Sequence, residues 1–204
     1  MRPDQVLDFA LLYGANCAGC HGADGRGGAA LGLANPIYLA IVDDDTLRAV
    51  TAHGVQNTAM PAFAKSAGGT LTDEQIGILV NGMRSRWGKA DALGGAKAPP
   101  YAATGDGNSQ HGSHLFNTYC AGCHGPDGNG GAKAGSVVDG SFLALVSNQS
   151  LRTLLIAGRP DIDHPDWRGY AAGRPLTASE VSDIVAWLAT QRRQFPGQPY
   201  PSSS

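Results

Sequence analysis

The sequence predicts an all-α protein built from two similar domains, and three observations support this fold class. Matching segments recur 103 to 105 residues apart, as between Cys17 and Cys120, which indicates duplication of a complete domain. Each copy closes with apolar residues at helical spacing. The 29 glycines and 12 prolines of the 204 residues favour shaped loops between short helices.

Composition excludes several classes of protein. Hydrophobic residues make up 42% of the chain, which is enough for a packed core. Charged residues make up only 16% and the formal net charge is -2, so no basic stripe typical of a nucleic-acid-binding protein is present. Because no apolar run reaches about 18 residues, we expect no transmembrane segment in this chain.

All four cysteines lie in two identical pentapeptides of sequence CAGCH, at 17–21 and 120–124. The pattern C-x-x-C-H is typical of covalent c-type haem attachment, since two thiols on one turn reach the two vinyl groups of a porphyrin. The adjacent histidine then lies under the iron as its proximal ligand. The predicted attachment residues are Cys17, Cys20, Cys120 and Cys123, and the predicted proximal iron ligands are His21 and His124.

Three other uses of these cysteines fit the sequence less well. A redox C-x-x-C needs no following histidine and is expected in a βαβ context that this sequence lacks. The two pairs are separated by far more than the usual spacing of zinc ligands. Two disulfides in an oxidising compartment remain the open alternative.

Each copy shows the same order of expected elements. A short helix ends at the C-x-x-C-H motif and a glycine-rich loop follows. A second helix is expected around 45–53 or 150–157, and then comes a loop that carries Met60 or His164. The loop sequences GVQNTAMPA and GRPDIDHPD place these two side chains in the same register, each before a proline.

The last helix of each copy has a recognisable start. Thr72 and Thr177 are expected N-caps, with Gln75 and Glu180 three residues later as capping-box partners. The apolar stripes that follow are Ile76, Leu79, Val80 and Met83 in the first copy and Val181, Ile184, Val185 and Leu188 in the second.

The repeat and the composition together predict four segments. The first domain is expected at 1–88 and the second at 111–195. Between them, 89–110 is rich in Gly, Ala and Pro and is expected to be a linker. A tail at 196–204 contains prolines and ends in serines.

Both halves resemble class I cytochrome c domains, and the whole resembles tandem di-haem cytochromes c. Residues 112–116 carry the Gly-x-x-Leu-Phe pattern of that family's first helix, whereas 9–13 begin with Phe9 in place of the glycine. The resemblance implies two small helical domains, each wrapped around one covalently bound haem c, and therefore two haem irons.

The missing glycine predicts a specific contact. The family packs its first-helix glycine against an aromatic residue of the last helix, which would pair Gly112 with Trp187 in the second copy. In the first copy the aligned pair is Phe9 and Gly82, so the small and large residues have exchanged sides. Since close-packed interiors conserve volume, we expect Phe9 to pack over Gly82.

The resemblance also implies a sixth iron ligand on the loop before the last helix. Met60 holds that position in the first copy, whereas Met83 aligns with the core stripe. The second copy has no methionine after its haem motif, and His164 falls in the register of Met60. We therefore expect two imidazoles at the second iron. An open or water-filled site, or a histidine turned to solvent, remain alternatives.

Some neighbouring polar residues have two interpretations each. An aspartate close to His164 could accept a hydrogen bond from its ring, or it could be solvated. The recurring arginines could contact haem propionates or face water. The other histidines after the first motif are expected to have packing or surface roles. The aspartates are Asp161, Asp163 and Asp166, the arginines are Arg48 and Arg152, and the histidines are His53, His111 and His114.

These expectations favour an electron carrier without catalytic residues over an enzyme. A His/Met haem has a higher potential than a bis-His haem, so the first haem is expected to be the high-potential centre. The alternative is a di-haem enzyme or sensor, peroxidase-like or binding a small ligand, in which His164 dissociates. A third possibility is a module of a larger respiratory or electron-transfer complex with redox protein partners. The family implies a periplasmic location, with an export signal that this sequence does not show.

Overall fold

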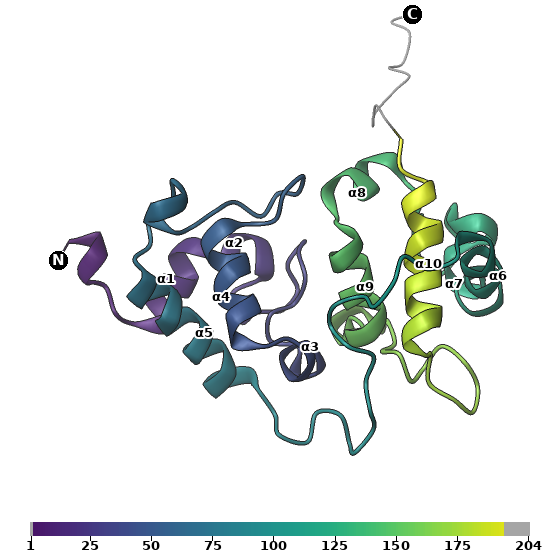
Figure 1. Cartoon of the computed structure of the whole chain (residues 1–204), viewed down its shortest axis with the longest axis horizontal. Coiled ribbons are helices and arrows are strands. Elements are labelled where there is room, and N and C mark those ends of the chain that lie inside the picture. Colours follow the sequence, from purple (N-terminus) through teal and green to yellow (C-terminus); the bar gives the residue numbers. More distant parts are fainter. Residues whose placement is uncertain (1, 194–204) are drawn as a thin grey trace, which may run out of the picture.

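The computed structural model describes residues 2–193, and within them it is helical, with only isolated β-bridges. Two helical halves lie side by side, joined by the segment after α5 that runs along the bottom of the view (Figure 1). No helix in this part of the chain is long and apolar enough to cross a bilayer. The expected tail at 196–204 lies outside the described residues.

Each half contains five α-helices in the described chain. The first half has α1 (Phe9–Asn16), α2 (Ala18–His21), α3 (Pro36–Ile41), α4 (Asp44–His53) and α5 (Asp73–Trp87). The second half has α6 (Ser109–Tyr119), α7 (Ala121–His124), α8 (Gly140–Leu145), α9 (Asn148–Ala157) and α10 (Ala178–Thr190). Short 3-10 turns lie at Pro3–Gln5, Lys65–Ala67, Pro126–Gly128 and Pro160–Ile162. The all-α fold class predicted from the sequence is confirmed.

The last helix of each half begins at its expected cap. The hydroxyl of Thr72 accepts from the backbone N–H of Gln75 at 3.2 Å, and the Gln75 side chain accepts from the Thr72 N–H at 3.0 Å. Thr177 and Glu180 form the same capping box at the start of α10. Two of the otherwise unpaired N–H groups of each helix are thereby satisfied.

Two short helices, α3 and α8, were not predicted from the sequence. Asn35 caps α3 by accepting from the N–H groups of Ile37 and Tyr38, and Pro36 occupies the first helical position. Asp139 caps α8 in the same way. Asn followed by Pro is a start signal that the sequence did contain, but six-residue helices have little periodicity.

The predicted exchange of small and large residues is confirmed in the first half. A Cβ atom added to Gly82 on α5 would overlap the ring of Phe9. The second half differs in detail from the prediction, because Gly112 packs against the backbone of Asp183 on α10. Trp187 instead lies against Phe116, with ring centroids 4.4 Å apart.

Substitution of the two glycines of α5 separates packing from helix propensity. We expect Gly82→Ala to lower the free energy of unfolding by about 1–3 kcal/mol, because the new methyl group overpacks against Phe9. Gly77→Ala is the matched control, since its Cβ would meet only the mobile end of Arg48. It is expected to be neutral or stabilising by up to about 1 kcal/mol. Urea unfolding of both variants measures the difference, and equal effects would contradict the packing assignment.

Arg152 anchors the middle of the linker to the second half. The residue is 2% exposed. Its guanidinium donates to the carbonyl oxygens of Pro100 and Tyr101 and to Ser182 Oγ. Gln149 donates to the Tyr101 carbonyl as well. Of the two interpretations of Arg152 from the sequence, solvent exposure is wrong, since the residue is buried against the linker. α6 begins at Ser109, inside the expected linker of 89–110.

Glu180 makes the stability of the second half pH-dependent. Hydrogen bonds from Arg174, together with those from Thr177, lower the pKa of Glu180 to about 2. A lowered carboxyl pKa stabilises the fold above the ordinary value near 4.5, and this contribution is lost as the pH falls from there toward 2.

Glu180→Gln keeps the capping box, as Gln75 does in the first half, but removes the charge. We expect it to cost about 1 kcal/mol at pH 7, a value reduced because Arg174 is half exposed. The difference from the unchanged protein should vanish near pH 2. Urea unfolding at both pH values measures it, and a difference independent of pH would contradict the ion pair.

Candidate haem sites

Both C-x-x-C-H motifs lie at the same structural position. Cys17 ends α1 and precedes α2, whose last residue is His21. Cys120 and His124 have the same relation to α6 and α7. None of the four cysteines forms a disulfide, and the second thiol of each motif is exposed. The thiols are therefore available on one helical turn in each half.

The histidine of each motif is oriented by a backbone carbonyl. His21 Nδ1 lies 2.7 Å from the Leu31 oxygen, and His124 Nδ1 lies 2.9 Å from the Gly135 oxygen. A carbonyl can only accept, so Nδ1 carries the proton and Nε2 keeps its lone pair for a metal. Burial lowers the pKa of His21, which favours the neutral imidazole that iron ligation requires.

Met60 and His164 occupy equivalent positions on their loops. Gly54 ends α4 with φ 69°, and Gly158 ends α9 with φ 67°. A Cβ atom on Gly54 would lie 2.6 Å from the Met60 carbonyl oxygen, and one on Gly158 would lie 2.7 Å from the His164 carbonyl oxygen. Only glycine fits so close to the ligand loop, and the register predicted from the sequence agrees with this geometry.

In the second half, the rings of His124 and His164 lie close together. Their centroids are 6.2 Å apart with an interplanar angle of 58°. Two imidazoles that ligate one metal ion from opposite sides, with bonds of about 2 Å, have ring centres roughly 6 Å apart. The pair therefore fits an iron between them. Burial and then the neighbouring His124 lower the pKa of His164.

Three buried polar atoms on the second ligand loop have no hydrogen-bond partner. They are His164 Nδ1, Trp167 Nε1 and the Tyr170 hydroxyl. Buried polar groups in native proteins almost always have partners, so three orphans on one short segment indicate a bound group with polar atoms. The propionates of a porphyrin are hydrogen-bond acceptors and fit the Trp167 Nε1–H and the Tyr170 hydroxyl in the second half.

The predicted aspartate partner of His164 is not seen. Asp161 is bound by Arg159 at 2.6 Å and Asp166 by Arg168 at 2.7 Å. Because His164 Nδ1 has no partner, Asp163 does not bond it either. Asp161 and Asp166 are thus paired within the loop, whereas Asp163 is exposed.

Trp167 and Tyr170 were missed at the level of the sequence. Trp167 is fully buried, and its backbone carbonyl oxygen accepts from the Leu176 N–H at 2.7 Å. The carbonyl oxygen of Phe63 accepts from the Leu71 N–H in the same way, at 2.8 Å. Alignment on Met60 and His164 pairs Phe63 with Trp167, so this signal was available. Tyr170 lies edge-on to His164 with ring centroids 5.8 Å apart, and no counterpart in the first copy announces it.

The residues expected to have other roles are found away from the motifs. Met83 is 4% exposed in the core of the first half. His111 lies 2.8 Å from Asp183, at the start of α6. His53 is exposed at the end of α4.

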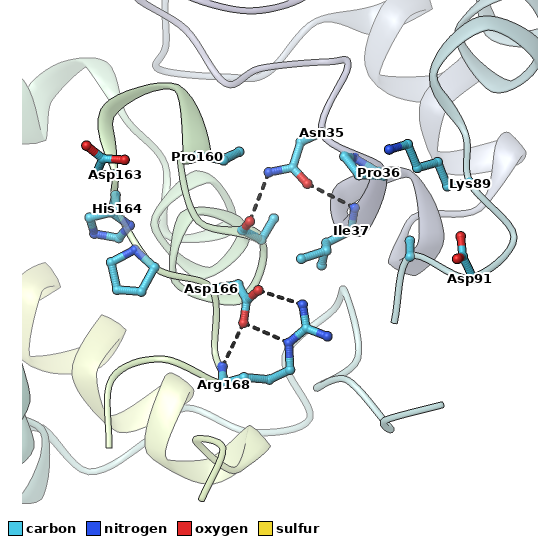
Figure 2. A pocket seen from close by; sticks show the side chains of 13 residues that line it. Asn35, Pro36, Ile37, Lys89, Asp91, Pro160, Asp163, His164, Asp166 and Arg168 are labelled. Carbon is cyan, nitrogen blue, oxygen red and sulfur yellow. Dashed lines mark hydrogen bonds and ion pairs between the residues drawn. The ribbon is translucent and has the colours of Figure 1, made fainter. Parts of the chain in front are cut away.

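A cavity of about 590 Å³ lies where the two halves meet, and His164 and Arg168 line it from the second half (Figure 2). Asn35 points across the boundary from the first half, and its amide donates to the Ala157 oxygen at 2.9 Å (Figure 2). The ligand loop of the second half thus lies next to the first half.

Comparison with known protein families decides what these two motifs belong to. The family model described as cytochrome c oxidase, cbb3-type, subunit III matches residues 4–81, and the cytochrome c family model matches residues 109–192. The chain consists of two cytochrome c domains in tandem. This cytochrome therefore has two covalently bound haem c groups, each with an iron.

Relatives of this cytochrome are named as subunits of redox enzymes. It is 31% identical over 156 residues to the cbb3-type cytochrome c oxidase subunit CcoP of Azospirillum sp. (strain B510), covering 68% of this chain and 47% of the relative. It is 35% identical over 104 residues to the fructose dehydrogenase cytochrome subunit of Gluconobacter japonicus, covering 46% of this chain and 21% of the relative. The chain thus spans less than half the length of these relatives.

A solved structure shares the overall fold. A chain of the reducing HAO-like protein complex of Kuenenia stuttgartiensis aligns with a TM-score of 0.51 at 16% identity. The alignment covers 93% of this cytochrome and 97% of that chain. At this identity the likeness supports the fold of this cytochrome alone.

Proposed function

We propose that this cytochrome carries single electrons between redox partners through two haem groups with different axial ligands. When bound, each haem iron supplies one-electron redox chemistry. The first domain would hold its haem by Cys17, Cys20, His21 and Met60, and the second would hold its haem by Cys120, Cys123, His124 and His164. The observation that carries the proposal is the closeness of the His124 and His164 imidazoles, whose 6.2 Å centroid separation fits one metal ion between them.

The ligand residues set the two potentials. The thioether of Met60 opposite His21 stabilises reduced iron and raises the potential of the first domain. The imidazole of His164 opposite His124 favours oxidised iron, so the second domain has the lower potential. With His21 and Met60 bound to one iron and His124 and His164 to the other, no ligand position would be left for a substrate, which suits a carrier rather than an enzyme.

The proposal extends to organisation and location. We assign the domains to 1–88 and 111–195, joined by a linker at 89–110. The relatives named as oxidase and dehydrogenase subunits support a role within a larger respiratory or electron-transfer complex. Covalent haem attachment in bacteria takes place outside the cytoplasmic membrane, which favours a periplasmic location.

Low-temperature electron paramagnetic resonance of the oxidised protein tests the ligand sets directly. We expect two low-spin ferric signals, one from His/Met and one from bis-His ligation. A potentiometric titration should then resolve two waves, with the His/Met spectrum reduced first. A single wave from two identical centres would contradict the proposal.

Carbon monoxide tests whether the second site opens. If His164 stays bound, the reduced protein should keep its spectrum under carbon monoxide. Ready binding of carbon monoxide by the second domain would instead favour an enzyme or sensor in which His164 dissociates.

A further inference from the structure

Arg159 joins the two haem-binding segments across the domain boundary. Its Nη2 donates to the carbonyl oxygen of Gly28 in the first domain at 3.3 Å. Its Nε and Nη2 also donate to the two carboxylate oxygens of Asp161, at 2.8 and 2.6 Å. The side chains of Arg159 and Asp161 are only 16% and 20% exposed. The carboxylate therefore fixes the guanidinium in the position from which it reaches Gly28.

On the first-domain side, Gly28 lies directly against the haem motif. A Cβ atom added to Gly28 would collide with the Cys20 carbonyl oxygen and the carbonyl carbon of His21. The same loop is tied back by the Ala30 N–H, which donates to the Cys20 oxygen at 3.0 Å. A displacement of the Gly28 carbonyl would therefore also move the backbone that positions His21.

On the second-domain side, the backbone of Arg159 is paired with His164. The Arg159 N–H donates to the His164 oxygen and the His164 N–H donates to the Arg159 oxygen, both at 3.0 Å. This mutual pair closes the loop that presents the imidazole. One residue therefore contacts the loop of the first haem motif with its side chain and the ligand of the second haem with its backbone.

The ligand loop of the first domain has no arginine at the position that corresponds to Arg159. Val55 aligns with Arg159, and its N–H donates to the Met60 oxygen at 3.1 Å. Its side chain carries no donor.

Asn35 supplies a second contact across the same boundary. It is 6% exposed, and its Nδ2 donates to the oxygens of Ala157 and Gly158 at 2.9 and 3.2 Å. These carbonyls end α9, just before Arg159. Asn35 holds the domains together without touching His164, so it contributes to docking in general.

We propose that Arg159 is a positioning residue for electron exchange between the domains. The inference rests on the proposed function, because it requires a haem ligated by His164. In the exchange one centre is oxidised as the other is reduced by the same electron, and neither a proton nor another reactant is needed. Arg159 fixes the His164 loop against the Gly28 loop, and so fixes the separation and orientation on which the exchange rate depends.

The test compares Arg159→Gln with Arg168→Gln in the holoprotein. Arg168 is a matched control, since it also binds an aspartate two residues away and donates to a first-half carbonyl, that of Leu93 at 3.3 Å. Leu93, however, lies in the linker. Pulsed photoreduction of the fully oxidised protein, followed at wavelengths that distinguish the two haems, gives the interdomain exchange rate.

We expect Arg159→Gln to slow the exchange about tenfold, because the docked arrangement loses hydrogen bonds to a charged group, which stabilise by enough to change its population about tenfold. Arg168→Gln should stay within about twofold, since its contact lies outside both haem loops. Arg159→Lys, which keeps one charged donor, should recover part of the rate. The potentials and the bis-His resonance signal should be unchanged in all three variants.

Each failure has a separate signature. Absence of a bis-His signal in the unsubstituted protein would refute the proposed function. Equal exchange rates in Arg159→Gln and Arg168→Gln, with that signal intact, would overturn the role of Arg159 alone. Loss of the signal in both Arg159 variants would mean that the residue serves only to fold the loop, and would overturn the inference as well.

Discussion

Replacement of His164 by methionine is expected to raise the potential of the second haem by on the order of 0.2 V, within the range of about 0.8 V over which axial ligands set haem potentials. The physical reason is that a thioether stabilises reduced iron better than an imidazole does. The loop already accepts methionine at this position in the first domain, where Gly54 leaves the same space. A potentiometric titration followed optically measures the shift.

The reverse change provides the control. Met60→His should lower the potential of the first haem and leave the second unchanged. A His164→Met protein with an unaltered potential, or one whose shift appears in the first domain, would show that His164 is not the ligand of the second iron.

The double substitution Cys120→Ala and Cys123→Ala is expected to halve the covalently bound haem. No other cysteine is available in the chain to form a thioether, because all four belong to the two motifs. Mass spectrometry of the acid-denatured protein measures the number of haems per chain, with two expected before the change and one after it. His124 alone would leave any remaining haem extractable.

The matched variant is Cys17→Ala with Cys20→Ala, which should leave a single haem in the second domain. The two variants then isolate the two spectra. Two covalent haems in either variant would contradict the assignment of the cysteines.

Features set by local chemistry were predictable from the sequence. The C-x-x-C-H spacing and the capping boxes at Thr72 and Thr177 involve neighbours in the sequence. The contact of Phe9 with Gly82 is distant in sequence and was predictable only because the repeat aligned it with Gly112 and Trp187. The bis-His assignment depends on one alignment, and the separation of the His124 and His164 rings agrees with it. It remains a prediction until a spectrum identifies the ligands.

Contacts between the two halves, and contacts with the nonrepeated linker, could not be predicted. Asn35 and Ala157 are separated by 122 positions, and Arg159 and Gly28 by 131. The burial of Arg152 was missed because its acceptors are carbonyls of the nonrepeated linker. Tyr170, unlike Trp167, has no aligned counterpart and shows its significance only through burial without a partner.

The anchoring of the linker by Arg152 has a consequence for how far the domains can separate. With Pro100 and Tyr101 held on α9, the tether between Trp87 and Pro100 spans only residues 88–99, and Arg168 contacts Leu93 within it. Even fully extended, such a tether reaches about 40 Å. A short tether keeps one domain at an effective concentration in the millimolar range around the other. If a docking partner separated the two halves, the tether would keep them close enough to reassociate rapidly.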